Sequence, residues 1–237
     1  MKKVAGHSRE EIIGKCLSLI DRPGTACAVT LNSLMLKYAW KHPEVLRAIR
    51  IADLITPDSV GIVYASFLLG GDKVRRYPGI EMAGELIKTG RSAYFLGAAP
   101  GVALKAAKEL KKRYPAANIV GIQNGFFNKA EEKEILKDIR SKTPDLLFVG
   151  LDMGRQELWI DKNRFKTGAG LVIGVGGSFD VFSGNLKRAP EIFKITGTEW
   201  LWRLRLESWR LGRIMSLPVF ALAVMARYIK RKGLLDQ

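Results

Sequence analysis

One acidic side chain stands out by its position in the sequence. Asp58 lies in ADLITPDSVGIV, residues 52–63, between Pro57 and Ser59 and shortly before Gly61. A strand followed by a tight turn is typical of this pattern, and open α/β sheets bind ligands beyond the carboxyl ends of such strands. A carboxylate there could act as a general base toward a bound hydroxyl. The local pattern alone favours a plainer alternative, in which Asp58 caps the following helix through Ser59 and Gly61.

Other residue types that often carry catalysis are scarce. The two histidines, His7 and His42, lie beside no motif, which disfavours a histidine-based triad. No two aspartates are spaced Asp-x-Asp, the pair with which many nucleotide-sugar enzymes hold Mn²⁺ or Mg²⁺. We therefore expect neither a metal nor another cofactor. A bound diphosphate would then have to be neutralised by Arg, Lys and backbone N–H groups.

Two glycine-rich turns follow apolar runs and could supply such N–H groups. FLGAAPGVALKAA follows a strand pattern and opens a helix, and GVGGSFD lies at the end of another strand pattern. Backbone N–H groups at these places bind phosphate readily, which makes Gly97 and Gly176 candidate substrate-binding positions. Neither turn matches the Gly-x-Gly-x-x-Gly fingerprint, and glycines at such turns often serve sterics alone.

The elements that must position these residues alternate along residues 1–187. Short apolar runs alternate with helical patterns, which predicts an α/β domain with a Rossmann-like, mostly parallel sheet and helices on both faces. The expected strands are 25–32, 53–57, 93–96, 118–127, 145–153 and the glycine-containing run 170–184. The expected helices are 33–52, with a break near Pro43, the Ala/Leu/Lys-rich stretch after the Gly97–Gly101 turn, and those at 129–144 and 154–167.

Residues 188–237 have a different character. From Leu186 onward there are eleven Lys or Arg against four Asp or Glu, and no strand–helix alternation. We expect a basic helical appendage that associates with a membrane. Arg203, Arg210 and Arg213 are spaced by seven and three, so one helix face could carry all three and grip a diphosphate, or simply face solvent.

An uncharged stretch follows these arginines. IMSLPVFALAVMA has thirteen residues and is followed by Arg227 and Lys230–Lys232. It is too short to span a bilayer, but it suits a helix lying in a membrane interface with basic anchors. The alternative is a helix that packs against the core at the chain end.

The whole chain limits the class of partner. It has 237 residues, 47% hydrophobic residues and a net charge of +16, so we expect a folded protein with an anionic partner: nucleic acid, anionic lipid or a phosphorylated ligand. The start lacks the apolar core of a signal peptide, and no uncharged run is long enough to span a membrane. Cys16 and Cys27 form no metal motif and are expected to be reduced core residues.

Several separated motifs agree with one family. In order from Thr30 to Arg213 they are TLNS, ADLITPDSVG, RYPGIEM, FLGAAPGVALKAA, PDLLFVGLDMGRQELWI, GVGGSFDVFSG, KRAP and TEWLWRL. The chain resembles the WecG/TagA/CpsF glycosyltransferases, which are N-acetylmannosaminyltransferase-like enzymes of glycosyltransferase family 26. They build polyprenyl-linked sugar chains for bacterial envelope polymers such as teichoic acid and exopolysaccharide.

The resemblance implies an inverting, metal-independent transfer of a sugar, N-acetylmannosamine or a hexose, from a UDP-sugar donor to a polyprenyl-diphosphate-linked sugar acceptor. It also implies a cytoplasmic enzyme, peripheral on the inner face of the membrane and in contact with its anionic surface, with no nucleic-acid partner. It leaves homo-oligomerisation open. The alternatives are a basic nucleic-acid-binding protein and a non-catalytic membrane scaffold.

The resemblance also assigns roles to residues. Asp58 matches the family's presumed catalytic base. Ser59 stands where the family usually has glycine, and its Cβ disfavours a positive φ, so the turn is expected to differ. The segment GLDMGRQE lacks the usual Gly-x-Pro-Lys. The remaining implied residues are Thr30, Asn32, Arg76 and Gln156 for substrate, and Arg203, Arg210 and Arg213 for the diphosphate. The resemblance thus implies that the basic helical appendage also completes the active site.

Overall fold

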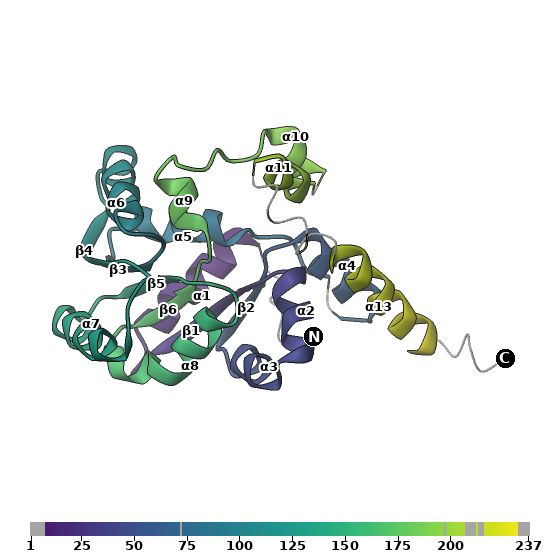
Figure 1. Cartoon of the computed structure of the whole chain (residues 1–237), viewed down its shortest axis with the longest axis horizontal. Helices are drawn as coiled ribbons and strands as arrows, with labels where there is room; N and C mark the ends of the chain where they lie inside the picture. The colour runs from purple at the N-terminus through teal and green to yellow at the C-terminus, as the bar shows by residue number, and fades with distance from the viewer. Residues whose placement is uncertain (1–7, 72, 197, 207–211, 213–215, 232–237) are drawn as a thin grey trace.

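A computed structural model describes residues 8–71, 73–196, 198–206, 212 and 216–231 (Figure 1). Its centre is a six-stranded sheet with the order β2-β1-β6-β5-β3-β4, and every neighbouring pair is parallel. The strands are β1 (Ala26–Leu31), β2 (Leu54–Pro57), β3 (Ser92–Gly97), β4 (Asn118–Gln123), β5 (Leu146–Gly150) and β6 (Leu171–Gly174). The predicted α/β class and parallel sheet are confirmed.

Helices cover both faces of the sheet (Figure 1). One face packs against α1 (Arg9–Ile20), α5 (Gly79–Lys88), α6 (Val102–Arg113) and α9 (Ser178–Phe182). The other face packs against α2 (Ser33–Lys41), α3 (Pro43–Arg50), α4 (Val60–Leu68), α7 (Lys129–Lys142) and α8 (Arg155–Thr167). The strands β1, β2, β5 and β6 are buried at every position, which explains why they are near-continuous apolar runs.

Local signals explain most of the helix boundaries. Pro43 at the first position of α3 separates it from α2, as the expected break requires. Helices α1 and α5 lie in stretches for which the sequence pattern made no assignment, and α9 lies within the run 170–184, where only Leu171–Gly174 forms the expected strand. Helix α1 nevertheless begins with a capping box, in which Ser8 and Glu11 bond to each other's backbone N–H.

The two cysteines are free and buried, as expected. Cys16 lies on α1 and Cys27 on β1. Burial raises the pKa of each thiol to about 12, so both stay protonated and unreactive in the folded protein.

The described part of the C-terminal segment is helical, as the sequence predicts. It forms α10 (Glu191–Ile195), α11 (Glu199–Leu206) and α13 (Ser216–Arg231). Helix α13 packs against α2 and α4, where Phe220 and Val224 are buried and Phe220 stacks on Trp40 at 5.4 Å between ring centroids. One side of α13 is therefore part of the core. Within the described ranges, no helix is both long and apolar enough to cross a bilayer.

Candidate active site

The predicted site residues of the α/β domain gather along one edge of the sheet. Because all six strands are parallel, their carboxyl ends lie at the same edge. There Thr30 is the penultimate residue of β1 and Asn32 follows that strand, Asp58 follows β2, and Gly97 ends β3. Gly176 follows β6 at that edge, and Gln156 lies in the first turn of α8, just beyond β5. The backbone N–H of Asp58 donates to the carbonyl of Leu31 at 2.9 Å, so β1 and β2 stay paired up to the site.

Asp58 is anchored at the start of a helix. Its Oδ1 accepts the backbone N–H of Gly79, the first residue of α5, at 2.7 Å. Helix N-termini favour negative charge, so this position suits an ionised carboxylate. The structure thus gives Asp58 a capping bond to α5, twenty-one residues along the chain, whereas the sequence pattern suggested a cap of the following helix α4.

Gly79 is needed for this approach. A Cβ at Gly79 would lie 2.8 Å from Oγ1 of Thr30 and 2.9 Å from its Cβ. Those contacts are closer than real Cβ atoms make, so a side chain there would push α5 away from the end of β1. The close contact between Gly79 and Thr30 therefore sets the position of the N–H that holds Asp58.

Ser59 fits its turn without strain. It has φ −117° and ψ 152°, which is extended backbone, so this turn has no need of the glycine that the family usually has. Its Oγ accepts the N–H of Ser33 at 3.1 Å and lies 3.0 Å from the Ser33 hydroxyl oxygen. Ser59 thereby ties the start of α4 to the start of α2 beside Asp58.

Arg76 joins Asp58 to the C-terminal segment. Its Nε donates to the backbone carbonyl of Asp58 at 3.0 Å, and its terminal nitrogen forms an ion pair with Glu199, the first residue of α11. Burial lowers the pKa of Arg76, and the neighbouring carboxylates of Asp58 and Glu81 oppose that shift. A second ion pair, from Arg188 to Glu81, also connects this segment to α5.

Thr30 and Asn32 hold the end of β1 in place. The Thr30 hydroxyl donates to the carbonyl of Gly174 on β6 at 3.0 Å. The Asn32 side-chain oxygen accepts the N–H of Met35 at 2.9 Å and caps α2. Thr30 and Asn32 therefore both already have structural bonds at this edge.

A chain of buried hydrogen bonds connects the loops after β5 and β6. Gln156 and Glu157 are each only 4% exposed. Glu157 accepts from the N–H of Gly154 and from Nε2 of Gln156, each at 2.7 Å. Gln156 in turn accepts the N–H of Gly176 through Oε1 at 2.8 Å. A Cβ at Gly174 would lie 2.4 Å from Nε2 of Gln156, so this glycine makes room for the amide.

The two glycines that were predicted to bind substrate, Gly97 and Gly176, differ in their surroundings. Gly97 has φ +140°, and a Cβ there would lie 2.2 Å from the carbonyl oxygen of Gly150 on the neighbouring strand. Sterics alone therefore require this glycine. Gly176 has φ +50° and faces open space, while its N–H is bonded to Gln156.

The three arginines expected at the diphosphate lie in the C-terminal segment. Arg203 falls within α11, whereas Arg210 and Arg213 lie outside the described residues. Helix α11 is joined to the site through the ion pair between Glu199 and Arg76.

Sequence reasoning gave no role to three residues that shape the site: Gly79, Glu157 and Glu199. Gly79 lies in the motif RYPGIEM and Glu199 in TEWLWRL, and these motifs could have pointed to both residues. Glu157 lies three residues after Gly154, which is capping-box spacing. In the part of the chain that the structure describes, no group of three His, Cys, Asp or Glu side chains is arranged to hold a metal ion.

Comparisons with known proteins identify the family. The model of the glycosyl transferase WecG/TagA/CpsF family matches residues 2–234. An N-acetylglucosaminyldiphosphoundecaprenol N-acetyl-beta-D-mannosaminyltransferase of Bacillus spizizenii is 33% identical over 210 residues, which are 87% of this chain and 81% of the relative. The enzyme of the same name from Staphylococcus aureus is 35% identical over 209 residues, 86% of this chain and 82% of the relative. The chain therefore belongs to the WecG/TagA/CpsF family and is a glycosyltransferase.

Proposed function

We propose that this enzyme transfers N-acetylmannosamine from a UDP-sugar to N-acetylglucosamine linked through a diphosphate to a polyprenyl lipid. Support for the sugar and the acceptor comes from the names of the two relatives, whose match covers more than four fifths of each chain. Support for the chemistry comes from the arrangement of Asp58, held at the start of α5 and bonded to Arg76 at the carboxyl edge of the sheet. This arrangement is the single observation on which the mechanism depends.

In the proposed mechanism, Asp58 removes the proton from the acceptor hydroxyl. The resulting oxygen attacks the anomeric carbon from the face opposite the diphosphate, a new C–O bond forms, and the bond to UDP breaks, which inverts the anomeric centre. A neutral sugar hydroxyl is a poor nucleophile, and positioned base catalysis typically contributes about 10²–10⁴-fold. The proton stays on Asp58 until it is released to solvent.

The leaving UDP carries developing charge that must be stabilised. Arg76 is the described guanidinium beside Asp58, and Arg203, Arg210 and Arg213 are proposed to join it from the C-terminal segment. Forked hydrogen bonds from arginine suit a diphosphate and leave no requirement for a metal. Thr30, Asn32, Gln156 and the turns at Gly97 and Gly176 would shape the sugar and nucleotide pocket.

The lipid-linked acceptor determines where the enzyme must work. Its diphosphate lies at a membrane surface, so the enzyme is proposed to bind peripherally to the inner face of the cytoplasmic membrane. The basic C-terminal segment supports this location, because anionic headgroups attract Lys and Arg.

A donor screen with product analysis tests the proposal. The full chain is incubated with a panel of UDP-sugars and a lipid-diphosphate-N-acetylglucosamine acceptor in EDTA, and UDP release is measured. We expect release with UDP-N-acetylmannosamine and a β-linked product by NMR. Preference for another donor would contradict the sugar assignment, a retained anomer would contradict the mechanism, and activity only after adding Mg²⁺ would contradict metal independence.

A further inference from the structure

Two helices that pack side by side expose large apolar side chains. Helix α13 lies against α4 (Figure 1). On α4 the side chains of Tyr64 and Phe67 are 63% and 66% exposed. On α13 Val219, Leu222 and Met225 are also exposed, with Leu222 at 71%. Large apolar side chains exposed on two neighbouring helices of a folded protein indicate a site of protein or membrane contact.

Helix α13 is apolar on both of its sides. Phe220 and Val224 face the core, while Leu222 and Met225 lie on the opposite side and are exposed. A surface helix normally turns a polar face to water. The charged residues of α13 instead gather at its end, where Arg227 and Lys230 are exposed. An apolar outer face with basic residues at one end is typical of a helix lying in a membrane interface.

Helix α4 leads directly from the catalytic edge to this apolar surface. It begins at Val60, two residues after Asp58, and the rise from Val60 to Phe67 is about 10 Å. The proposed acceptor presents its reacting sugar at Asp58 and its lipid tail in the bilayer, with a diphosphate between them. A membrane contact at the far end of α4 would allow the acceptor to reach Asp58 with its sugar while its lipid tail stays in the bilayer.

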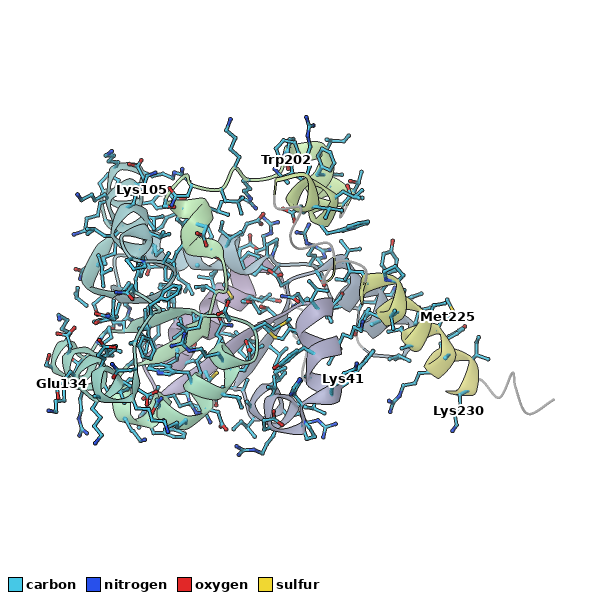
Figure 2. The ribbon with its side chains drawn as sticks, in the orientation of Figure 1. Lys41, Lys105, Glu134, Trp202, Met225 and Lys230 are labelled. Carbon is cyan, nitrogen blue, oxygen red and sulfur yellow. The ribbon has the colours of Figure 1, made fainter. Side chains whose placement is uncertain are left out.

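Charge complementarity indicates a bilayer as the occupant. Basic side chains lie near the apolar surface: Figure 2 labels Lys230 on α13 and Lys41 on the neighbouring α2, and both are exposed. Cations beside apolar side chains match anionic headgroups above acyl chains, where each basic residue near the surface contributes about 1 kcal/mol.

We propose that α4 and α13 form one membrane-binding surface, in which Tyr64 and Phe67 of the α/β domain insert into an anionic bilayer beside the lipid end of the acceptor. The inference rests on the proposed function and extends it. The C-terminal segment does not bind the membrane alone: the helix that follows the catalytic aspartate enters the same interface and sets the distance of Asp58 from the lipid.

The test compares the full chain with a Tyr64→Ser/Phe67→Ser variant. Both side chains are mostly exposed, so the variant is expected to fold, which its thermal unfolding checks. Binding is measured by co-sedimentation with vesicles of phosphatidylglycerol and phosphatidylcholine. We expect a roughly tenfold or greater loss of binding, because about half of the apolar contact is removed. The matched control is Leu104→Ser/Phe165→Ser, which changes exposed apolar residues of α6 and α8 and should bind normally.

A second measurement separates this inference from the proposed function. Transfer to an acceptor with a long polyprenyl chain in vesicles should fall with vesicle binding, whereas transfer to an acceptor with a short water-soluble alkyl chain should be unchanged. Vesicle binding remains measurable even if neither acceptor is used, so failure of the proposed function would be recognised separately.

Two results would overturn the inference. One is unchanged vesicle binding by the Tyr64→Ser/Phe67→Ser variant. The other is a fall in oligomer mass for this variant in sedimentation velocity without lipid, together with normal vesicle binding, since that would show that a second copy of the chain covers α4.

Discussion

The guanidinium of Arg76 contacts both Asp58 and Glu199: Nε donates to the Asp58 backbone carbonyl at 3.0 Å, and a terminal nitrogen pairs with the Glu199 carboxylate. One half-buried cation therefore connects the proposed base to the first residue of α11. A phosphate that bound Arg76 would have to share it with Glu199 or replace Glu199. The position of the C-terminal segment and the binding of the diphosphate are thus expected to be coupled through this arginine.

The first prediction concerns the proposed base. Asp58→Asn keeps an oxygen that can accept the N–H of Gly79, so the turn and α5 should remain in place. It removes the group that takes the proton, and we expect turnover to fall by at least about 10²-fold with little change in UDP affinity. Steady-state kinetics and calorimetric titration with UDP check this. Near-normal turnover would mean that Asp58 only caps α5.

The second prediction concerns the partner of Arg76. Glu199→Gln removes the carboxylate that competes with phosphate for the guanidinium. UDP should then bind more tightly, by about fivefold for a change of roughly 1 kcal/mol in a charge-assisted bond. Calorimetric titration without metal measures the change. Glu85→Gln, which removes an exposed ion pair with Lys88 on α5, is the control and should bind UDP as the wild type does. Weaker binding in Glu199→Gln would show that Glu199 supports the nucleotide site instead of competing with it.

The arrangement of the site could be predicted in part from the sequence. Apolar runs that alternate with helices predict parallel strands, and parallel strands bring Thr30, Asp58 and Gly97 to one edge. The bond from Asp58 to Gly79 could not be predicted, because it depends on where α5 returns to the sheet after an irregular segment. The serine at position 59 was expected to disfavour a positive φ, and its backbone is indeed extended, but the sequence did not predict its bond to Ser33.

The core contacts of α13 show the same limit. An uncharged run of this length suits either a membrane interface or a packed helix, and the sequence left both open. The structure shows that one side of α13 packs, through Phe220 and Val224. The positions of α2 and α4 determine which residues of α13 face the core. This tertiary information cannot be read from the sequence of α13 alone.

The third prediction concerns pH. Burial raises the pKa of Glu157 above its ordinary value of 4.5, although the donors from Gly154 and Gln156 oppose the shift. Between pH 4.5 and the raised pKa, the folded state binds more protons than the unfolded state, so stability falls as pH rises through that interval. Glu157→Gln cannot titrate there, and its free energy of unfolding should decline less with pH than that of the wild type.

Urea unfolding of both proteins at several pH values above 4.5 measures this difference. Glu131→Gln is the matched control, because Glu131 makes the same capping-box bond at the start of α7 but is exposed. Parallel curves for the wild type and Glu157→Gln would contradict the prediction and show that the two donors fully offset the effect of burial.

The fourth prediction separates the two sides of α13. Phe220 is 4% exposed, stacks on Trp40 and lies 3.6 Å from where a Cβ on Gly61 would be, so it is packed between α2 and α4. Leu222, two residues later, is mostly exposed. Phe220→Ala should lower the free energy of unfolding by about 3–5 kcal/mol through lost burial and a cavity, whereas Leu222→Ala should change it by less than about 0.5 kcal/mol.

Vesicle binding should show the opposite order under conditions in which both variants are folded. Leu222→Ala removes apolar area from the proposed membrane face and should weaken co-sedimentation several-fold, while Phe220→Ala leaves that face intact. Urea unfolding and vesicle co-sedimentation on the same two proteins give both quantities. If Leu222→Ala destabilises the protein as much as Phe220→Ala does, the outer side of α13 is packed in solution, for instance against a second copy. Its role would then be structural on both sides, and the membrane would have to be bound elsewhere.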